Sequence, residues 1–183
     1  MWRNRRTAVG PDEECIAHGT KLLCQIHRGM SSHAGEMRDE QDKVRWQYRN
    51  RANSANWNLG NPLKKPDFVI AEPGSKDEMV IRRVSLAPSV FKIIEAGKVI
   101  GTIRMLSVFR NEYSITIDGV SELTFRMPLF SVRFFGESGA GVEIWVQVGT
   151  SKMAWNILIK PDSTQRPLVA ALAFIHHEWY FYS

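Results

Sequence analysis

The sequence of 183 residues has few cysteines and no long apolar run. Its two cysteines, Cys15 and Cys24, are too few for a secreted disulfide scaffold, so we expect a reducing, cytoplasmic compartment. The longest apolar run, residues 168–175, is shorter than the ~20 residues that a membrane-spanning helix needs. The arginines near the start are not followed by the apolar stretch of a signal peptide. We therefore expect a soluble protein without a transmembrane segment.

Signatures of catalysis are missing as well. The sequence has no Gly-x-Ser-x-Gly nucleophile elbow and no Gly-rich phosphate loop followed by lysine. The nearest approach is the Gly-rich segment at residues 136–141, which lacks the lysine and lies between two expected strands. We interpret it as a hairpin loop. The sequence thus predicts a protein that is not an enzyme and needs no cofactor.

Cysteine and histidine occur at two spacings that resemble metal ligands, Cys15-x-x-His18 and Cys24-x-x-His27. Zinc fingers separate their two ligand pairs by about a dozen residues or more, whereas five residues separate His18 from Cys24. We favour incidental residues of an N-terminal segment and predict no metal. A compact site with four ligands stays open as the alternative.

Composition and charge are those of an ordinary globular protein with a basic excess. Hydrophobic residues make up 44% and charged residues 23%, and the length suits one domain with a tail. The formal net charge is +5, and it is uneven. Residues 78–110 hold six Lys/Arg against two Asp/Glu, a net +4 (6 − 2). Acidic partners are therefore favoured, most of all by this segment.

The chain divides into an N-terminal tail, residues 1–43, and a folded domain, residues 44–183. Gly, Pro and Ser interrupt the tail, which we expect to be poorly ordered apart from a short helix around residues 15–26. After it, apolar and polar residues alternate as in half-buried strands, with turns between them. The expected strands are residues 44–49, 68–71, 79–84, 90–95, 99–105, 113–117, 123–127, 130–134, 142–148 and 155–159. Strands at this spacing indicate an all-β barrel or sandwich.

The end of the sequence breaks this alternation. Asp162 and Ser163 can cap a helix, Pro167 suits a first turn, and residues 168–175 are apolar on every side. A helix without a polar face must be enclosed. We therefore predict a mainly β fold, an antiparallel β-barrel that encloses a hydrophobic C-terminal helix.

Two groups at the end of this helix have a catalytic or ligand-binding alternative. His176, His177 and Glu178 could serve acid–base chemistry or a metal, but adjacent residues point to different sides of a helix, which favours a structural role. The aromatic run at residues 179–182 is expected to close the barrel mouth rather than to stack on a ligand.

Several segments resemble the tubby C-terminal-like superfamily, and most of all its scramblase-like and LURP-one-related branch. They are residues 79–83 (MVIRR), 91–103 (FKIIEAGKVIGTI), 110–115 (RNEYSI) and 155–159 (WNILI), with the closing helix at 168–179. The resemblance covers residues 44–183 and implies a tubby-like barrel associated with lipid or a membrane surface, because tubby domains bind phosphoinositides. It transfers no residue roles. The chain lacks the cysteine-rich run, the calcium segment and the terminal transmembrane segment of scramblases, so lipid flipping by itself is not expected.

Basic residues on the expected strands are the candidate site for anionic headgroups. The set is Arg82, Arg83, Lys92, Lys98, Arg104 and Arg110. Several alternate with apolar residues, so we expect them to face outward. The sequence predicts a peripheral module that binds anionic lipid or phosphoinositide, with the strands and not the tail making the contact. The alternatives are a merely solvated face and a structural or protein-interaction platform. Nucleic acid ranks lower, because the aromatic residues fall mostly on the inward face.

Overall fold

The computed structural model describes residues 21–28, 34–51, 66–107, 112–118, 120–126, 134–138, 141–148, 154–159 and 166–181. This part of the chain forms twelve strands and one helix, labelled α2. The strands are β1 (Lys21–Arg28), β2 (Ala34–Arg38), β3 (Val44–Arg51), β4 (Asp67–Ala71), β5 (Glu78–Leu86), β6 (Ser89–Glu95), β7 (Lys98–Ser107), β8 (Glu112–Ile117), β9 (Val120–Arg126), β10 (Phe134–Ser138), β11 (Gly141–Val148) and β12 (Ala154–Ile159), and α2 spans Arg166–Phe181.

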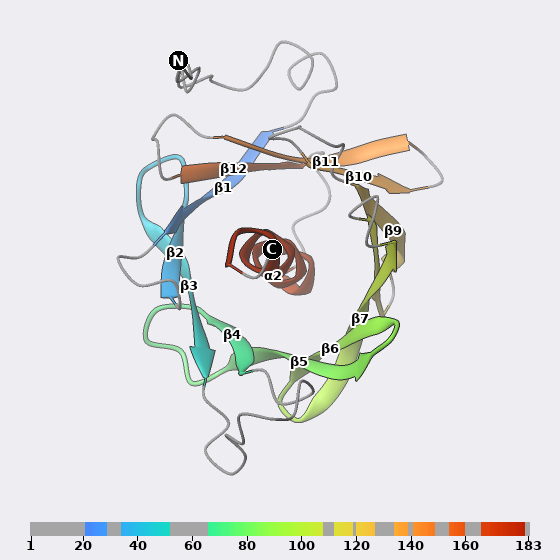
Figure 1. The fold of residues 1–183 in the computed structure, drawn as a ribbon. Helices are drawn as coiled ribbons and strands as arrows, with labels where there is room; N and C mark the ends of the chain where they lie inside the picture. The colour runs from blue at the N-terminus through green and yellow to red at the C-terminus, as the bar shows by residue number, and fades with distance from the viewer. Residues whose placement is uncertain are drawn as a thin grey trace, which may run out of the picture.

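Each strand pairs antiparallel with its neighbours in the chain, and the first strand pairs with the last. Strand β1 lies between β2 and β12, with Ile26 opposite Met37 on one side and Trp155 on the other. The twelve strands therefore form a closed barrel, and helix α2 lies inside it (Figure 1). Closure leaves none of these twelve strands with a free edge for pairing with another chain.

The alternating pattern decides which side chains line the barrel. On β5, Met79 and Ile81 are buried, whereas Arg82 and Val84 are exposed. Successive residues of a strand point to opposite faces, so the apolar set of each strand turns inward together. Adjacent strands contribute apolar residues at the same level, as where Ile81 lies opposite both Phe68 and Ile93. The core is thus built row by row around the helix.

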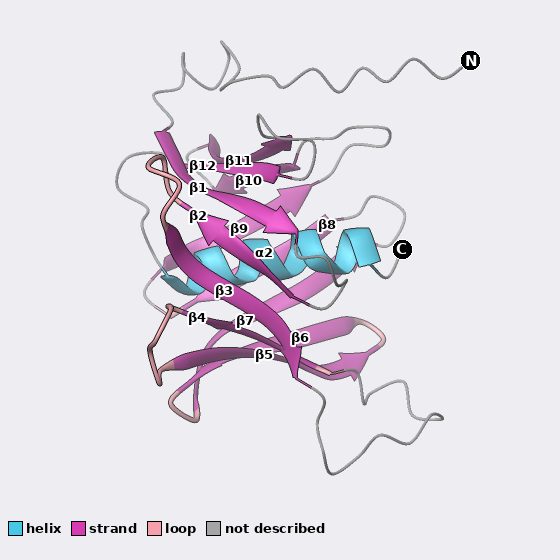
Figure 2. Ribbon diagram, turned by 90° about the vertical axis from the view of Figure 1, so that its left-hand side faces the viewer, coloured by secondary structure: helices cyan, strands magenta, loops and turns pink. Residues whose placement is uncertain are grey.

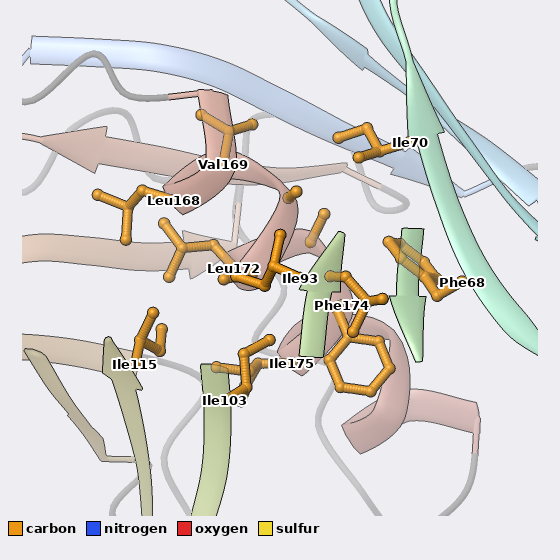
Figure 3. Close-up of a cluster of buried hydrophobic side chains, with 14 of the residues drawn as sticks. Phe68, Ile70, Ile93, Ile103, Ile115, Leu168, Val169, Leu172, Phe174 and Ile175 are labelled. Atoms are coloured by element: carbon orange, nitrogen blue, oxygen red, sulfur yellow. The ribbon is translucent and has the colours of Figure 1, made fainter. Parts of the chain in front are cut away.

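Helix α2 runs lengthwise through the barrel (Figure 2). Its residues 168–175 are each at most 4% exposed, which explains why no polar face is needed. Phe174 packs edge-on against Phe68 and Phe91, with ring centroids 5.5 and 4.6 Å apart, among side chains from both the helix and the strands (Figure 3). Three alanines (Ala170, Ala171 and Ala173) keep the helix slim enough to fit.

The two ends of the barrel differ. At the end where α2 begins, which we call the helix-start rim, Arg166 lies 3.2 Å from the carboxylate of Glu95 and donates a 2.9 Å hydrogen bond to the carbonyl of Asp77. At the end where α2 finishes, the helix-end rim, the ring of His177 lies 3.4 Å from the amide nitrogen of Asn50. The β4–β5 and β6–β7 turns lie at the helix-start rim, and the β5–β6 turn lies at the helix-end rim.

The expected mainly β, antiparallel chain with a hydrophobic C-terminal helix is confirmed, but the expected N-terminal tail must be corrected. Residues 21–28 and 34–38 are strands of the barrel, and the helix expected around residues 15–26 is a strand from residue 21 onward. These strands exist because β12 and β3 pair with them, which local sequence cannot reveal. Residues 1–20 lie outside the described part.

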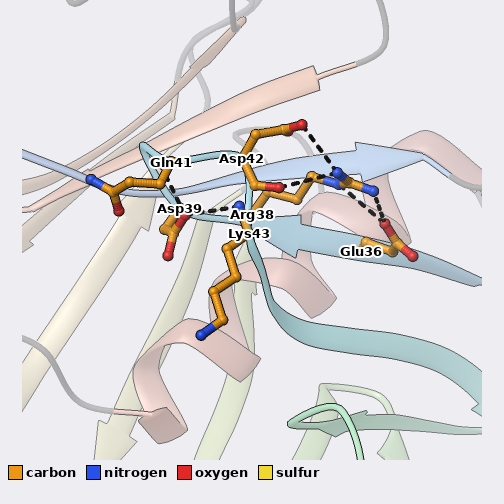
Figure 4. Close-up of polar contacts among 6 residues, drawn as sticks. All are labelled: Glu36, Arg38, Asp39, Gln41, Asp42 and Lys43. Atoms are coloured by element: carbon orange, nitrogen blue, oxygen red, sulfur yellow. Dashed lines mark hydrogen bonds and ion pairs between the residues drawn. The ribbon is translucent and has the colours of Figure 1, made fainter.

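The β2–β3 turn, which the sequence assigned to the tail and its boundary, is well connected. The carboxylate of Asp39 accepts hydrogen bonds from the backbone nitrogens of Gln41 and Lys43, at 3.0 and 2.9 Å. Arg38 bridges Glu36 at 2.8 Å and Asp42 at 3.3 Å (Figure 4). These contacts place a defined polar turn at the helix-start rim.

Of the strand expected at residues 130–134, the structure describes only Phe134, where β10 begins, and residues 130–133 are outside the described part. The Gly-rich segment at 136–141 does join two antiparallel strands, as expected. It is shorter than expected as a loop, because Ser138 and Gly141 already pair with each other. This geometry fits the interpretation as a hairpin.

Candidate functional site: a basic ridge on strands β5 to β7

Three of the six predicted basic residues are brought together by strand register. Arg82 lies directly opposite Lys92 across β5 and β6, and Lys92 lies opposite Thr102 on β7. Arg104 follows Thr102 by two residues, on the same outward face of β7. Diagonal neighbours of this kind stand about 7–8 Å apart. We call Arg82, Lys92 and Arg104 the basic ridge.

Arg82 is the member of the ridge whose charge is already compensated. Its guanidinium donates hydrogen bonds to both carboxylate oxygens of Asp67, from Nε to Oδ1 at 3.0 Å and to Oδ2 at 3.3 Å, and from Nη2 to Oδ2 at 2.7 Å. The hydrogen bond to Asp67 raises the pKa of Arg82 further above its usual value. The Asp67 side chain is only 5% exposed and that of Arg82 is 48% exposed. Arg82 therefore neutralises a buried carboxylate, and part of its role is structural.

Lys92 and Arg104 carry the uncompensated charge of the ridge. The Nζ of Lys92 lies 3.5 Å from Oγ1 of Thr102, which holds the ammonium against the strand surface. Arg104 is exposed, and its opposite neighbours are Val90 and Ser114. Within the residues that the structure describes, neither side chain is paired with a carboxylate. These two cations on adjacent strands are available to an external anion.

Arg83 does not belong to the ridge, because it lies on the inward side near the helix-end rim. Its guanidinium carbon lies 5.2 Å from the ring centroid of Phe91, and its Nη2 donates to Oγ of Ser89 at 3.1 Å. It also acts on Tyr113: burial and, to a lesser extent, the charge of Glu178 raise the pKa of that phenol to about 12, and Arg83 opposes the increase. Arg83 is therefore not among the outward-facing members of the predicted set. It forms part of the barrel interior.

The remaining two predicted residues are separate from the ridge. Lys98 is exposed but begins β7 at the β6–β7 turn, on the helix-start rim. Arg110 lies outside the described residues. The sequence had grouped six basic residues by their closeness along the chain, and strand register separates Lys98, at the helix-start rim, from the ridge.

Two residues that contact the basic ridge, Asp67 and Thr102, were not predicted from the sequence. Asp67 precedes an apolar strand, and only the register of β4 against β5 reveals that it neutralises Arg82. Thr102 was noted only as part of a strand, and its contact with Lys92 depends on the register of β6 against β7. Both would require a correct strand alignment to be found from sequence.

The histidines near the end of α2 have the surroundings of core residues. His176 and His177 are each 2% exposed. The ring of His177 packs against Phe68 at 5.2 Å and Tyr48 at 6.2 Å between centroids. This packing favours the structural interpretation over acid–base chemistry. The side chains of residues 179–182 lie outside the described part, so the expected plug is not tested.

Among the described residues, no cluster of three or more His, Cys, Asp or Glu side chains is placed to hold a metal ion. Cys15 and His18 are outside that part of the chain. Over the same residues, no helix has the length and apolar character required to span a membrane.

The chain was also compared with known proteins. Neither models of protein families, nor curated proteins, nor solved structures gave a match. The basic ridge must therefore be interpreted from its own chemistry.

Proposed function

We propose that this chain is a non-enzymatic, peripheral module that binds the anionic headgroups of membrane lipids, including phosphoinositides, through the basic ridge. The observation that carries the proposal is the pair of uncompensated cations, Lys92 and Arg104, on neighbouring strands. Within their own segment, Glu95 is the only carboxylate between residues 79 and 111, and it lies at the helix-start rim beside Arg166. On the flanking strands, Asp67 is neutralised by Arg82, and Glu122 accepts a hydrogen bond from Ser114, which lies opposite Arg104.

The energetics favour weak and reversible contact. A basic residue near an acidic membrane contributes about 1 kcal/mol. Fixed strands hold the charges at defined spacing, so less conformational freedom is lost on binding than for a mobile segment. The attraction should weaken as salt shortens the Debye length, which is about 8 Å at physiological ionic strength.

The proposal includes kinship with the tubby C-terminal-like superfamily, close to its scramblase-like and LURP-one-related branch. It is supported by the helix enclosed within antiparallel strands, which is the arrangement that the resemblance implies. A cytoplasmic location at the surface of a membrane follows as part of the same proposal.

The test compares two double charge reversals that alter net charge equally. Lys92→Glu with Arg104→Glu removes the free charges of the ridge. Lys76→Glu with Lys98→Glu is the matched control, because both lysines are exposed at the helix-start rim. Binding is measured by co-sedimentation with phosphatidylcholine vesicles, with and without phosphatidylserine or a phosphoinositide, at two salt concentrations. Arg82 is left intact in both variants, since its loss would leave Asp67 buried without its partner.

We expect the ridge variant to lose binding to acidic vesicles and the control to keep it. Equal losses of vesicle binding in both variants would mean that binding depends only on net charge, which would overturn the proposal. A parent protein that binds no acidic vesicle would also overturn it and favour the protein-interaction platform. The contribution of the N-terminus is measured by deleting residues 1–20, because a deletion of residues 1–43 would remove β1 and β2 from the barrel.

A further inference from the structure

Exposed apolar side chains gather at the helix-end rim, the rim nearest to Arg104 of the basic ridge. Among the described residues, four large apolar side chains are clearly exposed: Val84 (47%), Leu86 (38%), Val99 (45%) and Leu106 (50%). Val84 and Leu86 end β5 and Leu106 is near the end of β7, so these three lie at the helix-end rim. Single exposed apolar residues are common on protein surfaces. Three at one rim, close to Arg104, require an explanation.

Two of the three are exposed because of irregular strand pairing. The β5–β6 register shifts between Arg83 and Ser85, so Val84 has no partner opposite it. The β7–β8 register shifts between Met105 and Ser107, so Leu106 likewise has no partner opposite it. A bulge of this kind places an extra residue in one strand and redirects its side chain. Strand geometry therefore presents these apolar groups to solvent beyond the last paired core residues.

The apolar and basic groups lie at successive levels along the strands. Leu86 and Leu106 are level with the β5–β6 turn. Arg104 lies two residues from Leu106 toward the middle of the barrel, and Lys92 is level with Thr102, two residues further in the same direction. Two residues of a strand span about 7 Å. That spacing resembles the boundary of a bilayer, where apolar side chains reach the acyl boundary and cations remain with the headgroups.

The helix-start rim differs in carrying charges of both signs. Its turns hold the carboxylates of Asp39, Asp42, Glu72, Asp77 and Asp118 together with the ammonium groups of Lys43, Lys76 and Lys98. Of the four exposed large apolar side chains among the described residues, Val99 lies at this rim and the other three lie at the helix-end rim. The exposed apolar groups, rather than net charge, therefore mark the helix-end rim as the docking end.

We infer that the helix-end rim docks onto an acidic bilayer, with Val84, Leu86 and Leu106 entering the interfacial layer and the basic ridge contacting headgroup phosphates. This inference rests on the proposed function and names the intact bilayer, rather than a free headgroup, as the partner. Salt weakens the contribution of the ridge but not that of the apolar contact.

The experiment replaces Val84, Leu86 and Leu106 together by serine, with Val99→Ser as the control at the other rim. Binding to phosphatidylserine-containing vesicles is measured across a range of salt, and retention on heparin reports the ridge charges without a bilayer. We expect the triple variant to bind vesicles at least about tenfold more weakly, because the apolar area of three side chains stays in water. Its retention on heparin should match that of the parent, and Val99→Ser should change neither measurement.

The two proposals fail in different ways. If the triple variant binds vesicles like the parent while the ridge reversal abolishes binding, apolar docking is wrong and headgroup binding stands. If the parent binds no acidic vesicle, both are wrong. A nitroxide label on Leu106→Cys gives an independent measurement, with Val99→Cys as its control and Cys15 and Cys24 replaced by serine in both. Equal accessibility of both labels to a water-soluble relaxation agent on vesicles would exclude insertion of this rim.

Discussion

Removing the guanidinium of Arg82 should destabilise the barrel, because it leaves the carboxylate of Asp67 buried beside apolar strands. The Asp67 side chain is 5% exposed and accepts hydrogen bonds from both Nε and Nη2 of Arg82. Breaking a fully buried ion pair costs about 3–5 kcal/mol. Since the Arg82 side chain is 48% exposed, water can partly hydrate the remaining charge. We expect Arg82→Ala to lower the free energy of unfolding by about 2–3 kcal/mol, the range of hydrogen bonds to charged groups.

A double-mutant cycle separates this pair from general effects of substitution. Asp67→Asn removes the buried charge, so Arg82→Ala should cost less in that background, with a coupling energy of about 1–2 kcal/mol. The control is Arg45→Ala, whose partner Asp39 lies 4.0 Å away and whose side chain is 53% exposed. This surface pair should contribute no more than about 1 kcal/mol. The measurement is urea unfolding followed by circular dichroism.

The result also bears on the candidate site. Arg82→Ala should clearly lower the free energy of unfolding and change vesicle binding little. Arg104→Ala should weaken vesicle binding and change the free energy of unfolding little. Fully additive effects of Arg82→Ala and Asp67→Asn, or a cost for Arg82→Ala as small as that of Arg45→Ala, would refute the reasoning. Arg82 would then belong with the free cations of the ridge.

Three further predictions concern the core and the rims. Ala171→Arg should cost several kcal/mol or abolish folding, because Ala171 is fully buried in the barrel, whereas Val99→Arg at an exposed position should leave the thermal midpoint nearly unchanged. Gly101→Ala should cost about 1–3 kcal/mol in urea unfolding, since its Cβ would lie 2.8 Å from the carbonyl oxygen of Thr116; an unchanged midpoint would contradict this packing. Hydrogen bonds from Arg51, then Arg49, lower the pKa of Glu78 against the opposing effect of burial. The ionised Glu78 therefore stabilises the protein at pH values above its ordinary pKa, and this stabilisation is lost as the pH falls through the lowered pKa of the folded state. Glu78→Gln should make the loss of stability in acid less steep, which thermal melts over that pH range would measure.

The sequence alone determined the local character of the chain. Alternation of apolar and polar residues, as at residues 79–84 and 113–117, reports strands because the side-chain period of a strand is two. The all-apolar segment at 168–175 similarly required enclosure, because its residues leave no face for water. Each of these properties depends on neighbours a few residues away, so single-sequence reasoning reaches them.

Tertiary structure decided what depends on pairing between distant segments. Strand β1 escaped prediction because it pairs with β12, which lies more than a hundred residues further along the chain, and β2 was missed with it. Register and bulges set the orientation of the basic residues: Arg82 faces a buried Asp67 on the outside, whereas Arg83 lies over Phe91 within the barrel. The same bulges expose Val84 and Leu106 at the rim. A sequence specifies its side-chain period locally, but which strand lies opposite, and in which register, is decided only when the barrel closes and its core packs.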